Sequence, residues 1–220
     1  MSLPPPAIGV SATHFRAGSR SAVTRSLPEE TPVAMVYGGT TQAVMMASPS
    51  DLEDFAVGFS LTEGIVAAAS EIQRLEVLDH PQGLEAQMWL AEDRAEALAA
   101  RRRFMTGPVG CGLCGIDSIA EAVRALPRLG QAGVSLDAAE VAAATEVLKD
   151  WQPLHQQTRA THAAGFLIPG RGIVLAREDV GRHNALDKVI GALARQGIDA
   201  GTGAFVLTSR VSTEMVQKCA

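Results

Sequence analysis

The feature that most constrains the fold is an amphipathic helix predicted over residues 184–196. Gly197 follows it as a helix stop. Apolar residues return every three or four positions along one face, at Leu186, Val189, Ile190 and Leu193. Short apolar strands are predicted before it, over 164–168 and 172–176, and after it, over 204–208. Strands and helices that mix without strict alternation predict either an α+β fold or a three-layer α/β fold.

The first half of the chain shows the same mixture of elements. Gly38-Gly39 between two apolar runs predicts a hairpin of strands 33–37 and 40–47. Ser50 and Glu53 form a capping-box pattern, so we expect a helix from there to about residue 66. The remaining predicted elements are strands over 72–78 and 84–90, helices over 91–103, 116–126 and 137–151, and a last helix from Ser212.

Three regions are expected along the chain. Residues 1–28 are Pro- and Ser-containing and predict a flexible lead-in. Residues 29–104 predict a smaller N-terminal α+β subdomain, and residues 105–220 a second domain that opens at a Gly-Pro break. The last helix stops at Ala220 without a cap or turn, which indicates a C-terminal truncation or, alternatively, a frayed terminal helix.

Composition narrows the functional classes. Of the 220 residues, 47% are hydrophobic and 20% charged, which is typical of a protein that buries a core. The net charge of −5 argues against a nucleic-acid partner, and no apolar run approaches the roughly 18 residues that span a membrane. Residues 1–20 lack the apolar centre of a secretory signal, so we expect a cytoplasmic location with reduced thiols.

A glycine-rich cysteine loop over residues 106–115 carries the most reactive groups. Cys111 and Cys114 are separated by two residues, and four glycines surround them. Two such thiols can share a metal, form a reversible disulfide, or divide a transfer reaction. The loop leads into a predicted helix, whose N-terminus favours the thiolate. The upstream triplet Arg101-Arg102-Arg103 either adds positive potential at the loop or is a solvated helix end.

Zinc is not expected at this loop. A structural zinc site needs four Cys or His ligands, and the chain has one CxxC. The zinc deaminase pattern places a proline before the first cysteine and needs H-x-E upstream; Gly110 precedes Cys111, and neither His14 nor His80 begins H-x-E. A thioredoxin-like disulfide is not expected either, because that motif lies near the start of a βαβ unit with aromatic flanks, whereas this pair lies mid-chain among glycines. A purely structural role is also not expected, because thiols surrounded by glycines do not fill a core.

A second polar group lies at the start of the helix over 184–196. Arg182, His183 and Asn184 sit where backbone N–H groups and a guanidinium suit an anion such as phosphate. An ordinary capped helix start with surface charges explains the same residues equally well. His162, before a predicted strand, is either structural or able to assist proton transfer.

Together these segments resemble the formate dehydrogenase accessory sulfurtransferase family, FdhD. The resemblance covers roughly residues 28–220, and its most specific part is the run REDVGRHNALDKVIG over 177–191. The other matching stretches are FAVGFSLTEGI (55–65), CGLCG (111–115), HAA (162–164) and STEMVQK (212–218).

The resemblance implies a persulfide carrier. Family members accept sulfur from a cysteine desulfurase and deliver it to the molybdenum bis(molybdopterin guanine dinucleotide) cofactor before its insertion into formate dehydrogenase. The first family cysteine, matching Cys111, holds the persulfide, and Cys114 assists. His162, Arg182, His183 and Asn184 are then candidates for cofactor binding. The implied fold is cytidine-deaminase-like, without zinc, and the implied assembly is a homodimer.

Two departures and two rival functions accompany the resemblance. The family continues past the position of Ala220 with a segment credited with cofactor binding, and its cysteine loop more usually has serine or glycine at 107–109. One rival is a thiol–disulfide oxidoreductase in which Cys111 and Cys114 cycle with each other. The other is a noncatalytic chaperone of the apo-dehydrogenase or its cofactor.

Overall fold

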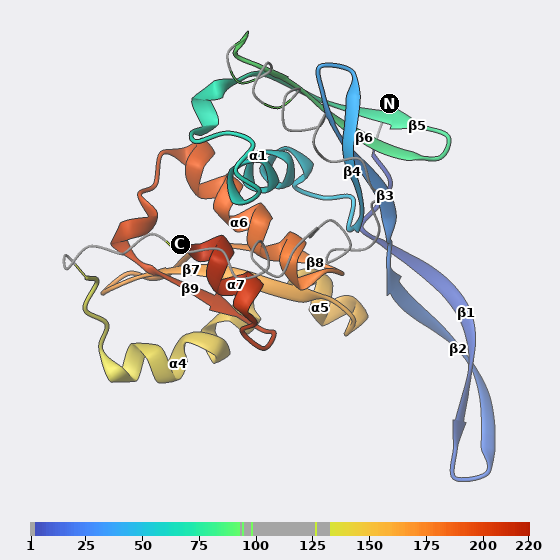
Figure 1. The fold of residues 1–220 in the computed structure, drawn as a ribbon. Coiled ribbons are helices and arrows are strands. Elements are labelled where there is room, and N and C mark those ends of the chain that lie inside the picture. Colours follow the sequence, from blue (N-terminus) through green and yellow to red (C-terminus); the bar gives the residue numbers. More distant parts are fainter. Residues whose placement is uncertain (1–2, 93, 95–97, 99–125, 127–132) are drawn as a thin grey trace.

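The computed structural model describes residues 3–92, 94, 98, 126 and 133–220 (Figure 1). The cysteine loop with Cys111 and Cys114, the arginine triplet, and most of the helices predicted over 91–103 and 116–126 lie outside the described residues. The division of the chain at residues 104–105 also falls there and stays a prediction. Within the described ranges, no helix has the length and apolar character needed to cross a membrane.

A four-stranded mixed sheet forms the first half of the fold. Its order is β4 (Thr40–Ala47), β3 (Thr31–Tyr37), β6 (Gly83–Leu90) and β5 (Ile72–His80), and only the β3–β6 pair is parallel. The expected hairpin is confirmed: Gly38 and Gly39 both have positive φ, which the tight turn requires. The helix α1 (Leu52–Thr62) packs on this sheet, with Phe55 fully buried against the strand residues Met35 and Met88.

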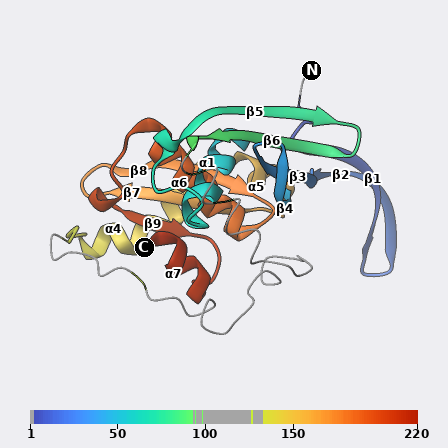
Figure 2. The same ribbon diagram turned by 45° about the horizontal axis from the view of Figure 1, so that its top comes forward.

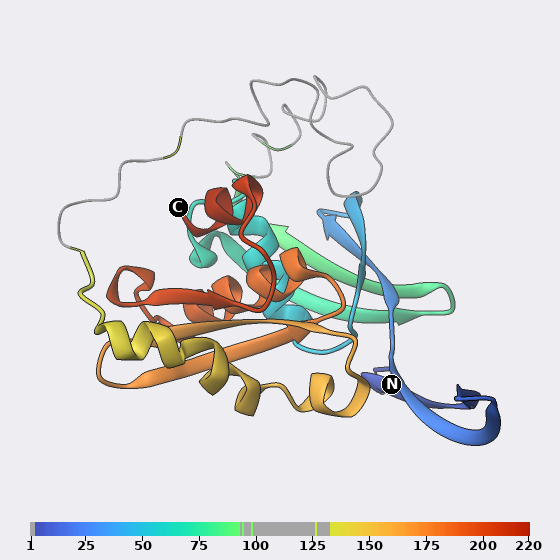
Figure 3. The same cartoon turned by 90° about the horizontal axis from the view of Figure 1, so that it is seen from below.

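A three-stranded antiparallel sheet forms the second half, in the order β8 (Gly172–Asp179), β7 (His162–Ile168) and β9 (Ala204–Leu207). The long helix α6 (Arg182–Gln196) ends at Gly197 in the left-handed conformation, as predicted. It covers one face of the sheet, while α4 (Ala138–Leu148) covers the other (Figure 3). The expected mixed α+β fold with helix–sheet–helix layers is therefore confirmed.

The two halves meet along α1 and α6, which lie between the two sheets (Figures 1 and 2). Gly58 and Gly191 lie at this contact and leave no room for a side chain on either helix. Charged groups join the same helices at their edges: Asp54 of α1 accepts hydrogen bonds from Arg177 of β8 and Arg195 of α6. Small residues at the crossing let the backbones approach, so the halves form one packed unit.

The helix predicted over 137–151 begins where expected. Asp137 is the N-cap of α4 and forms a reciprocal capping box with Glu140. The predicted helix end at residue 151 is a short 3-10 turn, η2 (Lys149–Trp151), followed by α5 (Pro153–Thr158), which the sequence did not indicate. Glu178 of β8 accepts the backbone N–H groups of Leu154 and His155, so a distant carboxylate caps α5.

Residues 1–28 differ from the expected flexible lead-in, because most of this segment forms regular strands. They contain an antiparallel hairpin of β1 (Ala7–Arg16) and β2 (Ser19–Pro28), paired at ten positions. Ala17 and Gly18 make the turn, both with positive φ. The alternation of apolar and polar residues along β1 carries the strand signal, which the prolines and serines at the ends of the segment obscure.

The first helix also begins and ends differently from its prediction. Asp51, in the left-handed conformation, is the N-cap of α1 and makes no side-chain capping bond, so the Ser50–Glu53 capping box is wrong. The helix ends at Thr62 because Ser60 O accepts the N–H groups of Ile65 and Val66 and turns the chain. The last helix, α7 (Thr213–Cys219), begins after Ser212 as predicted. Short 3-10 turns, η1 (Ala69–Glu71) and η3 (Ala200–Thr202), complete the described elements.

Candidate functional site

The structure brings together the four site residues that it describes. His162 opens β7 and pairs across the sheet with Asp179, the last residue of β8. Three residues later α6 begins, with Arg182, His183 and Asn184 in its first turn. His162 and Arg182 are close enough for the guanidinium to act on the imidazole electrostatically. Cys111 and Cys114 lie outside the described residues, so their position relative to this group stays a prediction.

His162 is held as a neutral imidazole. The ring is half-buried, and burial lowers the pKa of His162 below its usual 6.5, with further lowering by the charge of Arg182 and by His155. The carboxylate of Asp179 opposes this effect more weakly. At neutral pH the ring therefore carries one N–H donor and one free lone pair.

His183 lies at the junction of α6 and α7. Its Nε2 is 2.9 Å from Glu214 Oε2, although the ring N–H is not aligned on the carboxylate as a hydrogen bond requires. Burial lowers the pKa of His183, and Arg182 lowers it further, while Glu214 acts in the opposite direction. The ring is thus neutral at neutral pH and gains charge only in mild acid.

Buried polar atoms without a hydrogen bond gather at this junction. The part of the chain that the structure describes has four buried side-chain nitrogen or oxygen atoms without a hydrogen bond, and three of them lie at the starts of α6 and α7. They are Arg182 Nε, His183 Nε2 and Ser212 Oγ. Unpaired buried polar atoms are costly, and at a helix start they offer donors to an anionic group.

Asn184 has a different role from the one expected on the sequence. It is 3% exposed, and its amide nitrogen donates to Met46 O at 2.8 Å and Asp179 Oδ1 at 2.9 Å. Both amide protons are used inside the protein, so the side chain ties the start of α6 to the end of β4. Its role as a cofactor ligand stays a prediction, limited to the amide oxygen.

Asp179 is the centre of the polar network that positions this turn. The carboxylate is fully buried and accepts from the backbone N–H groups of Ser48 and Gly181 at 3.0 and 2.8 Å. Lys188 Nζ, also fully buried, lies 2.7 Å from Asp179 Oδ2 and donates to Ser48 O. A buried ion pair with its remaining groups hydrogen-bonded holds the backbone that carries Arg182 and His183.

A second buried cluster fixes α7 beside this site. Lys218 Nζ donates to Thr62 Oγ1, Glu63 Oε1 and Asp187 Oδ2 at 2.9 to 3.1 Å. Burial disfavours the ammonium, but the carboxylates of Asp187 and Glu63 outweigh it and raise the pKa of Lys218. The cluster joins α1, α6 and α7 and so sets where Ser212 and Glu214 lie. Sequence reasoning missed it because its members are far apart in the chain.

Comparison with known proteins assigns this chain to a family. The sequence profile of the FdhD/NarQ family matches residues 28–220. A sulfur carrier protein FdhD from Agrobacterium fabrum is 54% identical over 211 residues, which cover 96% of this chain and 78% of that protein. The sulfur carrier protein FdhD of Brucella abortus is 56% identical over 195 residues, covering 89% and 72%.

A solved structure shares the fold. The crystal structure of a Desulfotalea psychrophila protein, assigned as a formate dehydrogenase accessory protein, matches with a TM-score of 0.71 and 28% sequence identity. The match covers 98% of this chain and 80% of that one. The sequence resemblance, the profile match and the shared fold agree, and this chain belongs to the FdhD/NarQ family.

Proposed function

We propose that this protein is a cytoplasmic sulfur carrier that serves a formate dehydrogenase. The observation that carries the proposal is membership of the FdhD/NarQ family over residues 28–220, with relatives named sulfur carrier proteins at up to 56% identity among those compared. The CxxC pair of the sequence supplies the thiols that such a role needs. The substrate is the molybdenum bis(molybdopterin guanine dinucleotide) cofactor, and the working form is a homodimer.

Cys111 takes the sulfur in the first step. Its thiolate attacks the outer sulfur of a persulfide on a cysteine desulfurase, forms a Cys111 persulfide and releases the desulfurase thiolate. One sulfur–sulfur bond forms and one breaks, so this step needs no oxidant or reductant. The resulting persulfide is itself a good nucleophile towards the metal of the substrate.

Cys114 completes the transfer. Delivery of the sulfur as sulfide requires two electrons, and the thiolate of Cys114 supplies them by attacking Cys111 Sγ. The terminal sulfur leaves as hydrosulfide to the metal, and a Cys111–Cys114 disulfide remains. A cellular dithiol then reduces this disulfide and restores both thiols.

The start of α6 binds the anionic part of the substrate. Arg182 offers a buried Nε without a partner, and His162 and His183 are neutral donors beside it. Phosphate oxygens accept hydrogen bonds from such groups and from the free N–H groups of the first helical turn. A neutral imidazole also has a lone pair, so either histidine can take a proton as sulfur is transferred.

Intact-protein mass spectrometry tests the proposal. The protein is incubated with a cysteine desulfurase and cysteine, beside the variants Cys111→Ala, Cys114→Ala and the matched control Cys219→Ala. We expect a reductant-sensitive gain of one sulfur atom in the wild type and the control, and no gain in Cys111→Ala. No gain in the wild type, with the desulfurase shown to be active, contradicts the carrier role and favours a chaperone.

A single-turnover assay with formate dehydrogenase distinguishes the carrier from the remaining rival, a thiol–disulfide oxidoreductase. Cys114→Ala is loaded with sulfur and then supplied with the cofactor and the apo-enzyme in a single turnover. A carrier retains the first step, so the loaded sulfur persists on Cys111. A thiol–disulfide oxidoreductase without Cys114 neither loads sulfur nor turns over, and that result would reject the carrier mechanism.

A further inference from the structure

A carboxylate lies next to the anion site proposed at the start of α6. Glu214, in the first turn of α7, places Oε2 2.9 Å from Nε2 of His183, and the two side chains are only 26% and 27% exposed. Arg182, beside His183 on α6, has a buried Nε without a hydrogen bond. The charge of Glu214 opposes an anion bound to Arg182 and His183 unless a positive group lies between the two negative charges.

The ring of His183 lies where such a positive group is needed, but its neutral form cannot serve both neighbours. A neutral imidazole has one N–H donor and one lone pair, whereas a carboxylate and a phosphate oxygen both accept hydrogen bonds. If the N–H serves the anion, the lone pair faces Glu214, and if the N–H serves Glu214, the lone pair faces the anion. The imidazolium has two N–H donors and satisfies both acceptors at once.

The charges around His183 favour this change when an anion binds. In the free protein, burial and then the charge of Arg182 lower the pKa of His183, Lys218 lowers it further, and Glu214 raises it. An anion held by Arg182 offsets the charge of that guanidinium and adds a negative charge beside the ring, and both changes favour the imidazolium. Other titratable groups on the packed elements are already paired or neutral: Asp179 of β8 with Lys188, Lys218 with Asp187 and Glu63, and the neutral His162 of β7.

We propose that Glu214 is a positioning residue of the anion site, which holds the imidazolium form of His183 against a bound phosphate group, so that each anion binds together with one proton. The inference rests on the anion site proposed above and not on sulfur transfer by the cysteines. The proton comes from the solvent and returns to it when the anion leaves. By reciprocity, the anion raises the pKa of His183 by the same factor by which the proton raises the affinity for the anion.

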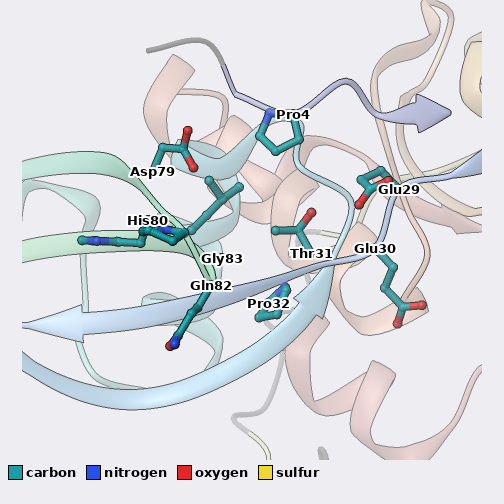
Figure 4. Close-up of a pocket in the computed structure, with 11 residues that line it drawn as sticks. Pro4, Glu29, Glu30, Thr31, Pro32, Asp79, His80, Gln82 and Gly83 are labelled. Atoms are coloured by element: carbon teal, nitrogen blue, oxygen red, sulfur yellow. The ribbon is translucent and has the colours of Figure 1, made fainter.

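NMR titration of the histidine rings, in sulfate and in chloride at equal ionic strength, measures the coupling. Sulfate has the shape of phosphate and does not titrate near neutral pH, so any proton taken up belongs to the protein. We expect saturating sulfate to raise the pKa of His183 by about one pH unit or more, which equals a gain of about tenfold in sulfate affinity on protonation. His80 is the internal reference, because its Nε2 lies 3.5 Å from Glu85 and it lines a separate pocket with Glu29 and Asp79 (Figure 4). Its signals are expected to respond alike to the two salts.

The variant Glu214→Gln tests the carboxylate itself. An amide can donate to the lone pair of a neutral ring, so sulfate is expected to bind this variant without proton uptake and with an affinity that no longer depends on pH near neutrality. The matched control Glu85→Gln makes the same change at the reference pair and is expected to keep the wild-type response of His183. A Glu214→Gln variant that keeps the full response overturns the proposal.

The wild-type titration decides the question even if Glu214→Gln does not fold. A His183 ring that titrates alike in sulfate and chloride, although sulfate binds, overturns the proton coupling and leaves the anion site in place. Signals of residues 181–184 without a saturable response to either sulfate or pyrophosphate overturn the anion site and the coupling together. Sulfur loading of Cys111 is measured separately, so neither result is confused with failure of the carrier role.

Discussion

Gly58 of α1 and Gly191 of α6 face each other so closely that the two helix backbones touch. A Cβ atom at Gly58 would lie 1.7 Å from Asp187 O, and one at Gly191 would lie 1.8 Å from Asp54 O. Both obstacles are backbone atoms, which cannot move aside as a flexible side chain can. The contact joins the two halves of the fold and sets the angle at which α6 presents Arg182 and His183.

Substitution at this contact is expected to destabilise the fold strongly. Gly58→Ala forces the helices apart, and we expect a loss of about 3 kcal/mol or more in the free energy of unfolding, at the upper end for overpacking. Urea denaturation followed by circular dichroism measures it. The control is Gly9→Ala, where the nearest atom to a new Cβ is 3.8 Å away. A Gly58→Ala variant as stable as the control would show that the helices are not in close contact.

The buried pair of Asp179 and Lys188 gives a second stability prediction. Lys188→Met leaves the buried carboxylate without its cation, and Asp179→Asn leaves the ammonium without its anion, so each is expected to cost about 3–5 kcal/mol. The double variant removes both charges and is expected to lose less than the sum of the two singles, by about 1–3 kcal/mol. Denaturant unfolding of all four proteins forms the cycle. Additive losses would mean that the two groups do not interact.

Local patterns in the sequence predicted the elements whose signals are local. Gly38-Gly39 predicts its hairpin because only residues that tolerate positive φ make that turn. Asp137 predicts the start of α4 because its side chain caps the nearest N–H groups. The apolar spacing in 184–196 predicts α6 because one face of it is buried.

The roles of the polar residues in 177–191 could not be predicted from the sequence, because their hydrogen-bond partners are distant in the chain. Asp179 and Asn184 bind the backbone of Ser48 and Met46, which are more than 130 residues earlier in the chain. These residues and Lys188 position the turn, in which Arg182 Nε and His183 Nε2 make no hydrogen bond, although His183 Nε2 lies near Glu214. Gly58 is a similar case: in the sequence it weakens a helix, whereas in the fold it allows the backbones of α1 and α6 to touch.

The two histidines of the site predict a loss of stability in mild acid. Burial, followed by the charge of Arg182, lowers the pKa of both His162 and His183 below 6.5 in the folded state. A group with a depressed folded pKa binds fewer protons folded than unfolded, so its contribution is fully present above pH 6.5 and falls as the pH drops towards the folded pKa. Urea unfolding at several pH values measures the slope.

The double variant His162→Gln/His183→Gln separates this effect from the titration of carboxylates. It is expected to flatten the pH dependence of the unfolding free energy just below pH 6.5, the ordinary pKa of histidine, and to leave the rest of the curve unchanged. NMR titration of the ring protons gives the folded pKa values directly. Values at or above 6.5 for both rings would contradict the burial and charge effects assigned to this site.

Cys219 is predicted to be an unreactive thiol, although the residue as a whole is exposed. Enough protein surrounds the sulfur that burial, assisted by the carboxylate of Asp187, raises the pKa of Cys219 to about 11. At pH 8 only about one such thiol in a thousand is ionised, compared with about a quarter for a free cysteine. The higher intrinsic nucleophilicity of a more basic thiolate recovers part of this difference, so we expect alkylation roughly twentyfold slower than that of free cysteine.

Peptide mass spectrometry after timed iodoacetamide treatment measures the alkylation rate of Cys219, with urea-unfolded protein as the control. Labelling of Cys219 in the folded protein as fast as in the unfolded protein would mean that its thiol is solvated, and Cys219 would then compete with Cys111 for sulfur.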